Sequence, residues 1–204
     1  DHGVEGICCT VVTEKERYEL DIPAPGEHMA YAAAIAAAAG EALGLSREEI
    51  VRGAASYVPV GSRMRVLRLS ERRLILDDCY NANPQSVAAA LEILARTERD
   101  KKIAVLGDMG ELGDIRSRAH YNMGALAAML GIDLVFAIGS GDLAGKIADG
   151  VALSGGSVLY FPTKEEALPE LRRQMEQPGT VMLAKASHAM KFEWLVERLR
   201  ETGE

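Results

Sequence analysis

The sequence has few cysteines and no long apolar run, and each shortage excludes a class of protein. Only three of the 204 residues are cysteine. Two of them, Cys8 and Cys9, are adjacent, so the three form neither a disulfide framework nor a zinc pattern. The longest apolar stretch, residues 29–39, is rich in alanine and too short to span a bilayer, and no signal peptide is visible. We therefore expect a cytoplasmic protein without a membrane partner.

Clustered positive charge and recognisable catalytic or metal-binding patterns are missing as well. The net charge is −7, and no run of lysine and arginine carries interleaved aromatic residues, so we expect no nucleic-acid partner. The four histidines lack metal-ligand spacing, and sequence adjacency supports no Ser-His-Asp or Cys-His arrangement. We assign no catalytic residue and no metal ligand. The composition, 48% hydrophobic and 26% charged, is that of an ordinary globular protein.

Apolar runs alternate with helical stretches from residue 64 onward. The pattern predicts strands at residues 65–69, 74–77, 103–106, 134–138, 158–161 and 180–183, and helices at residues 84–96, 116–130, 142–149, 164–174 and 190–200. Such alternation predicts an α/β fold with a mostly parallel sheet and helices on both faces. Pro84 fits the first turn of its helix, where a missing N–H costs nothing.

The first 60 residues follow a different pattern. It predicts a hairpin from residues 6–13 and 17–22, an alanine-rich helix over residues 27–43 and a second helix over residues 46–55. Ser46 and Glu49 form a capping-box pair that starts the second helix. The stretch Val58–Gly61 is a linker candidate, because the composition changes there. We predict one domain at residues 1–60 and another at residues 61–204.

Polar residues follow the predicted strands at their carboxyl ends. Asp77 and Asp78 end one strand, and the turn after them contains Asn81 and Asn83. Ligands of an open parallel sheet bind beyond the carboxyl ends of its strands. Acids there suit a ribose hydroxyl, a metal-bound nucleotide or a substrate amine, and amides suit ribose or amide recognition. The same residues also fit a solvated strand end with a helix cap and an ordinary Asn-Pro turn, so both interpretations stay open.

Two glycine-containing loops have part of a phosphate-binding pattern. Residues 107–113 lie between a predicted strand and a helix, where backbone N–H groups can bind a phosphate or carboxylate. Their glycine spacing is not that of a dinucleotide fingerprint. Residues 139–146 look like a phosphate loop, but Ser140 replaces a required glycine and Ile147 replaces the serine or threonine that would hold Mg²⁺. We interpret this second loop as a turn and a helix start.

The last predicted strand is followed by a cation, a hydroxyl and an imidazole. Lys185, Ser187 and His188 supply these groups, again at a carboxyl end. Together they suit a small anionic substrate. They equally suit a helix start with Ser187 as its cap, and the sequence does not decide between the two.

Several segments together resemble the Mur ligase family. They are Pro25-Gly26-Glu27-His28, Gly61-Ser62-Arg63-Met64, Asp77 to Pro84, Gly107 to Gly113 and Lys185-Ala186-Ser187. The resemblance extends along the whole chain and is closest to the member that joins D-Ala-D-Ala to UDP-MurNAc-tripeptide in peptidoglycan biosynthesis, using ATP and Mg²⁺. It implies the end of a central ATPase domain at residues 1–60 and a C-terminal Rossmann-like domain at residues 61–204.

The resemblance also implies what this chain lacks. The family's Gly-Lys-Thr phosphate loop and its carbamylated lysine, which helps to hold Mg²⁺, have no counterpart in the sequence. We therefore expect Mg²⁺ to be bound mainly outside this chain, and the chain to be inactive alone as a ligase. We also expect a monomer.

Individual residues acquire expected roles from the same resemblance. The cofactor-binding group comprises Arg63, Asp78, Asn81, Asn83 and His28, and the substrate-binding group comprises Lys185, Ser187 and His188. Arg63 and Asp78 match residues that reach the ribose and phosphates of ATP, whereas Lys185 and Ser187 match a loop that contacts the incoming dipeptide. Glu111 and His120 match common family positions to which we assign no role.

Four positions depart from the family pattern. Met29 and Ala32 replace asparagines, the second of which contacts adenine, so the adenine contact is in question. Ala186 and His188 replace glycine and arginine in the final loop, which alters carboxylate recognition because histidine is not always charged.

Three other interpretations of the chain stay open. They are a different Mur ligase, a module that binds a nucleotide or dipeptide without turnover, and a structural piece that docks on missing domains. The amide-rich turn at residues 81–83 argues against a different Mur ligase, since its sister enzymes more often carry histidine there.

Overall fold

In the computed structural model, which describes residues 3–201, the chain divides between Val60 and Gly61 into two units. We call residues 3–60 unit 1 and residues 61–201 unit 2. Each unit has its own buried apolar core. Every helix among the described residues is too short or too polar to cross a bilayer.

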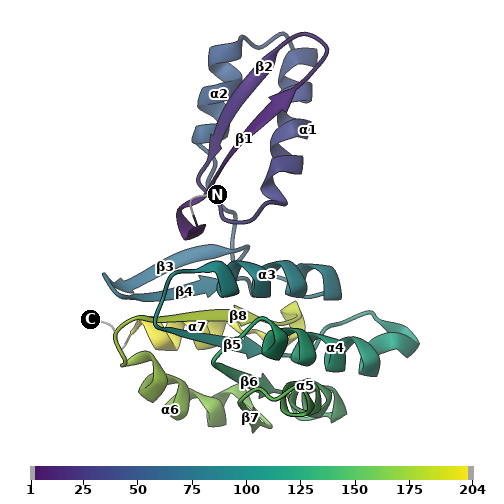
Figure 1. The fold of residues 1–204 in the computed structure, drawn as a ribbon, viewed down its shortest axis with the longest axis vertical. Helices are drawn as coiled ribbons and strands as arrows, with labels where there is room; N and C mark the ends of the chain where they lie inside the picture. Colours follow the sequence, from purple (N-terminus) through teal and green to yellow (C-terminus); the bar gives the residue numbers. More distant parts are fainter. Residues whose placement is uncertain (1–2, 202–204) are drawn as a thin grey trace. The chain divides into compact units, whose positions relative to one another are not determined.

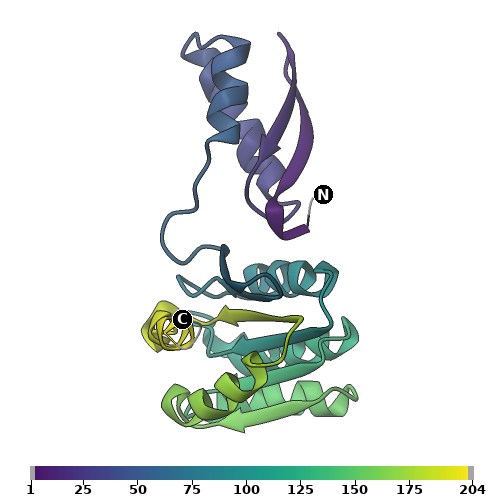
Figure 2. The same ribbon diagram turned by 90° about the vertical axis from the view of Figure 1, so that its left-hand side faces the viewer.

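Unit 1 is a two-stranded hairpin with two helices on one of its faces (Figure 2). Its elements are the 3₁₀ turn η1 (Gly3–Glu5), β1 (Ile7–Val12), β2 (Arg17–Ile22), α1 (Met29–Ala42) and α2 (Arg47–Ala55). Tyr18, Leu20 and Ile22 alternate along β2 and point into the core, as the period of a strand requires. Ser46 and Glu49 cap α2 reciprocally, as predicted.

Unit 2 contains a six-stranded sheet (Figure 1). Its elements are β3 (Arg65–Ser70), β4 (Arg73–Asp77), α3 (Pro84–Arg96), β5 (Lys101–Leu106), η2 (Gly113–Ile115), α4 (Arg116–Met129), β6 (Leu134–Ile138), α5 (Asp142–Leu153), β7 (Val158–Phe161), α6 (Lys164–Met175), β8 (Thr180–Lys185), η3 (His188–Met190) and α7 (Glu193–Arg200). The strand order is β3-β4-β8-β5-β6-β7, and only β3 runs antiparallel to its neighbour. This confirms the predicted α/β fold with a mostly parallel sheet.

Helices cover both faces of this sheet. α3, α4 and α5 form one layer, and α6 and α7 form the other (Figure 2). On the second face the core includes Ile103, Phe136, Met182 and Leu195. All six residues of β8 are buried, because this strand has a strand on each side and helices above and below.

The position of β8 decides where ligands can bind. β4 and β5 lead into α3 and α4 on one face, whereas β8, which lies between them, leads into α7 on the other. Neighbouring strands whose connections leave to opposite faces open a crevice at their carboxyl ends. Such a switch point flanks β8 on both sides. The segments that follow β4, β5 and β8 therefore form the candidate edge.

Two helices differ from their predicted limits by three residues or more. α5 continues to Leu153 rather than ending near Asp149, because Gly150 lies within it: a Cβ there would be 2.1 Å from the carbonyl oxygen of Tyr121 in α4. The last helix begins at Glu193, after η3 and a left-handed residue, Lys191 with φ 50°. This turn buries Phe192 completely in the core.

Candidate functional site

Backbone hydrogen bonds join the three segments at the carboxyl ends of β4, β8 and β5. The N–H of Asp78 donates to the carbonyl oxygen of Ala184 at 3.0 Å, and that of Gly107 donates to Lys185 at 3.0 Å. The N–H of Ser187 in turn donates to the carbonyl oxygen of Asp108 at 2.8 Å. We call residues 78–83, 107–113 and 185–190 together the carboxyl edge.

A buried ion pair crosses this edge. The Nζ of Lys185 lies 2.5 Å from Oδ2 of Asp78 and 3.0 Å from the carbonyl oxygen of Asn81, and the Lys185 side chain is 2% exposed. Oδ1 of Asp78 accepts the N–H of Met64 at 3.0 Å. A buried ammonium needs such compensation. Lys185 ends β8 rather than following it, and it binds the turn after β4 to the start of unit 2.

The two asparagines expected to bind the nucleotide organise the turn before α3. Oδ1 of Asn83 accepts the N–H of Ser86 at 2.9 Å, and Oγ of Ser86 accepts the N–H of Asn83 at 3.1 Å. Oδ1 of Asn81 accepts the N–H of Ala82 at 2.8 Å. Both side chains are exposed. Their side-chain oxygens already accept hydrogen bonds from backbone N–H groups, so a ligand would bind to their NH₂ groups.

Two residues expected to contact different ligands both lie near one exposed aromatic ring, that of Tyr80. Cζ of Arg63 is 3.8 Å from the ring centroid of Tyr80, which is a cation–π distance. The centroids of the Tyr80 and His188 rings are 5.9 Å apart. Nδ1 of His188 lies 3.5 Å from Oε1 of Glu193. Sequence reasoning missed Tyr80 as a site residue, because its exposure depends on the fold.

Asp77 and Cys79 point away from solvent. Asp77 is fully buried, and its Oδ2 lies 2.8 Å from Nη2 of Arg65 on the neighbouring strand. It is therefore no solvated strand end, and Asn83, not an acid, caps α3. Burial raises the pKa of the Cys79 thiol, and Asp77 raises it further, so this thiol stays protonated and unreactive.

A buried histidine holds the loop after β5. Nε2 of His120 accepts the N–H of Met109 at 2.8 Å, while Nδ1 lies 2.6 Å from the carbonyl oxygen of Arg116. Nδ1 therefore carries the proton of a neutral imidazole. Gly107 allows this loop to approach the segment after β8: a Cβ there would be 2.8 Å from side-chain atoms of Ala186 and Phe192.

Asp108 lies between these fixed points. Its side chain is half-buried, and burial raises the pKa of its carboxyl group. Sequence reasoning left this acid unassigned. Its place in a strand–loop–helix segment marked it as a candidate, but its burial could not be read from the sequence.

The remaining predicted site residue, His28, belongs to unit 1. It is exposed and occupies the N-cap position of α1 without a side-chain cap bond. All the others lie in unit 2, at the carboxyl edge or, for Arg63, against Tyr80 of that edge.

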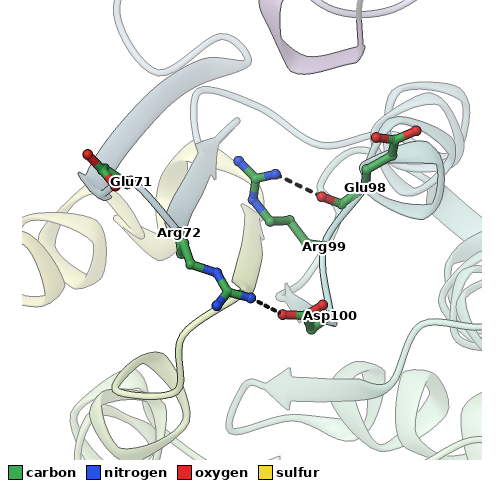
Figure 3. A pocket seen from close by; sticks show the side chains of 6 residues that line it. Glu71, Arg72, Glu98, Arg99 and Asp100 are labelled. Atoms are coloured by element: carbon green, nitrogen blue, oxygen red, sulfur yellow. Dashed lines mark hydrogen bonds and ion pairs between the residues drawn. The ribbon is translucent and has the colours of Figure 1, made fainter.

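A separate pocket of about 110 Å³ lies at the opposite end of the sheet (Figure 3). It is lined by Glu71, Arg72, Glu98, Arg99, Asp100 and Gly179. Nη2 of Arg72 is 2.7 Å from Oδ2 of Asp100, and Nη1 of Arg99 donates to the carbonyl oxygen of Glu98 at 2.8 Å. Arg72 and Asp100 therefore neutralise each other within the lining, and the pocket shares no residue with the carboxyl edge.

The fold is that of a Rossmann-like domain whose central strand, β8, has a topological switch point on each side. Residues 62–188 match the family profile described as Mur ligase, glutamate ligase domain. The chain belongs to the Mur ligase family.

Relatives of known name agree with this assignment. The chain is 32% identical, over 99% of its length, to the UDP-N-acetylmuramoyl-tripeptide–D-alanyl-D-alanine ligase of Escherichia coli (strain K12), of which it covers 43%. It is 34% identical to the enzyme of that name from Treponema pallidum (strain Nichols), covering 98% of this chain and 45% of the relative. A crystal structure of MurF from Acinetobacter baumannii superposes with a TM-score of 0.86 at 32% identity, covering 97% of this chain and 43% of that one. The chain thus spans less than half the length of these relatives.

Proposed function

We propose that this chain is the C-terminal portion of a MurF-type ligase, which uses ATP to join D-Ala-D-Ala to UDP-MurNAc-tripeptide in peptidoglycan biosynthesis. Residues 1–60 would complete a central ATPase domain, and residues 61–204 would form the C-terminal domain. One observation carries the proposal. Arg63, expected at the nucleotide, and His188, expected at the acceptor, both lie near the same Tyr80 ring, which belongs to the carboxyl edge. A ligase must bring these two ligands together.

In the reaction, a phosphoryl group would pass from ATP to the substrate carboxylate, giving an acyl phosphate and ADP. The amine of the acceptor would then attack the acyl carbon and displace inorganic phosphate. The residues of this chain would position the reactants and stabilise charge. The guanidinium of Arg63 is exposed and suits phosphate oxygens. Ser187 and His188 suit a substrate carboxylate. The Lys185–Asp78 pair would hold the end of β8 against the turn after β4, and so fix the backbone that carries these groups.

A cytoplasmic site of action, as a monomer, completes the proposal. All three cysteines are free thiols: Cys8 is exposed, Cys9 is partly exposed and Cys79 is buried. Adjacent thiols near the surface stay reduced in a reducing compartment such as the cytoplasm.

Isothermal titration of the chain with D-Ala-D-Ala tests the acceptor site. We expect binding that weakens about tenfold in Ser187→Ala, the scale of one hydrogen bond to a charged group. Ser154→Ala, an exposed serine at the far end of α5, is the matched control and should bind like the parent chain. Lys185→Ala is less informative, because it also removes the partner of Asp78. If the parent chain does not bind the dipeptide, the proposal that this chain carries the acceptor site is wrong.

A second assay addresses catalysis. The sequence contains no Gly-Lys-Thr phosphate loop, so we expect the chain alone to release no phosphate and form no amide bond when supplied with ATP, Mg²⁺ and both peptide substrates. Measurable ligation by the chain alone would contradict the proposal that catalysis needs a phosphate loop outside this chain.

A further inference from the structure

Asp108 has an acidic side chain that the fold fixes without giving it a partner. Its Oδ1 is enclosed, and none of the described residues donates a hydrogen bond to it. Oδ1 lies against the turn after β6, where a Cβ added to Gly139 would approach it to 3.0 Å. Buried polar atoms without a hydrogen bond are rare in proteins, and each one calls for an explanation.

The backbone around this acid is held from three directions. The carbonyl oxygen of Asp108 accepts the N–H of Ser187, and the N–H of the next residue, Met109, donates to His120. On the other side, the N–H of Gly107 donates to Lys185. These bonds come from β8, from the segment after it and from α4. These bonds fix the backbone from which the carboxyl group projects, and a fixed backbone favours a preorganised binding group.

Two cations near the carboxyl ends of β8 and β4 are engaged elsewhere. Lys185 pairs with Asp78, and Arg63 lies over Tyr80. His120 faces the loop from α4 as a neutral imidazole whose Nε2 already accepts a hydrogen bond. The half-buried carboxylate of Asp108 thus lacks compensation from these groups. A cation supplied by a ligand would provide it, and it would approach the other carboxylate oxygen, Oδ2, because Oδ1 is enclosed.

We propose that Asp108 binds the protonated amine of the acceptor substrate. The inference rests on the proposed function and assigns the two ends of the acceptor: its carboxylate to Ser187 and His188, its ammonium group to Asp108. A dipeptide spans at most about 7 Å, which suits neighbouring segments joined by the bond between Ser187 and Asp108. A primary ammonium offers three donors and one positive charge, and a single carboxylate can neutralise it.

Titration calorimetry on the 204-residue chain with two ligands tests this assignment. D-Ala-D-Ala carries the ammonium group, and N-acetyl-D-Ala-D-Ala lacks it while keeping the carboxylate. We expect the parent chain to bind the free amine about tenfold or more tightly than the acetylated ligand, the scale of a charge-assisted hydrogen bond. Asp108→Asn, which keeps the shape and removes the charge, should abolish this preference and leave the affinity for the acetylated ligand within about twofold.

Two further variants make the result specific. Asp149→Asn changes an exposed aspartate in the last turns of α5, where it pairs with Lys146, and should behave like the parent chain. Asp108→Glu keeps the charge but moves it, and should retain part of the preference for the free amine. Circular dichroism of each variant verifies that it folds.

The outcomes separate the inference from the proposed function. If the parent chain prefers the free amine and Asp108→Asn keeps that preference, Asp108 does not bind the ammonium group, and the acceptor site itself stands. Equal binding of both ligands by the parent chain also overturns the inference alone. If the parent chain binds neither ligand, the proposed acceptor site is wrong, and so is the role assigned to Asp108.

Discussion

His120 shows how one buried side chain can organise a loop without facing a ligand. It is fully buried, and its two ring nitrogens connect Arg116 of α4 with Met109 of the loop after β5. Both nitrogens are satisfied, so the imidazole has no capacity left for a metal or substrate. Its role is to position the carboxyl edge.

Replacing His120 by alanine should destabilise unit 2. The N–H of Met109 would lose its acceptor, and a cavity would replace the ring, so we expect a loss of about 2–4 kcal/mol. Denaturant unfolding followed by circular dichroism measures it. His188→Ala, which changes an exposed imidazole, is the control and should change stability by about 0.5 kcal/mol or less. Equal effects of the two variants would contradict the role assigned to His120.

The ionised form of Asp108, which would bind the ammonium group, is also the form that burial disfavours, so binding and stability make opposite demands on this residue. Burial raises the pKa of its carboxyl group above the ordinary value of 3.8. The folded state therefore keeps this proton at a pH where the unfolded state has released it. The favourable contribution is complete below pH 3.8 and is lost as the pH rises through the raised pKa. We expect Asp108→Asn to raise the midpoint of thermal unfolding at pH 7 but not at pH 3. A lower midpoint at pH 7 would show that the carboxylate stabilises the fold.

At the scale of elements, the helix starts that carry a capping pair were predicted better than the other helix limits. The capping pairs act within one turn of a helix, so Ser46 with Glu49 and Pro84 after Asn83 mark α2 and α3 in the sequence itself. The end of α5 depends on α4, which packs against Gly150. Gly150, one residue beyond the predicted end, is a contact point between the two helices.

Glu41 connects the hairpin of unit 1 to α1. Its Oε1 accepts hydrogen bonds from the hydroxyls of Thr13 at 2.5 Å and Tyr18 at 2.9 Å. The bond from Thr13, and to a smaller extent that from Tyr18, lowers the pKa of the Glu41 carboxyl below its ordinary value of 4.5. The stabilisation is therefore complete above pH 4.5 and is lost as the pH falls through the lowered pKa.

We accordingly expect the hairpin to loosen in acid. Hydrogen exchange of the amides of residues 7–22, corrected for intrinsic rates, should show protection that decreases below about pH 4. Glu41→Gln keeps the acceptor oxygen without a titrating group, and should remove this pH dependence. If hydrogen-exchange protection of residues 7–22 in the parent chain stays constant down to pH 3, ionised Glu41 does not stabilise the hairpin.

At the scale of the whole chain, the fold class follows from the alternation of apolar runs and helices, but the strand order does not. Asp78 and Lys185 are far apart in the sequence and form an ion pair because β8 lies between β4 and β5. The segments at the carboxyl ends were identified as candidates from their residue types. Their mutual contacts, such as Arg63 over Tyr80, need the tertiary fold and could not be predicted.

The division of the chain between Val60 and Gly61 predicts where a protease cuts first. Tyr57 is 38% exposed and lies outside regular secondary structure, whereas the exposed Tyr31 lies within α1. Brief chymotrypsin treatment should therefore cut after Tyr57 and release two stable pieces, which mass spectrometry identifies. Tyr57→Ser should slow this cut. First cleavage inside either unit would contradict the division.

The insertion of β8 between β4 and β5 also has a consequence for biosynthesis. The ribosome produces β4 and β5 long before β8, and in the finished sheet each of them hydrogen-bonds to β8 and not to the other. Until the strand at residues 180–185 emerges, the nascent chain carries two open strand edges that have no correct partner. Such edges attract other chains. Translation stopped before β8 should thus leave an aggregation-prone product, and the last strand made is the one that closes the sheet.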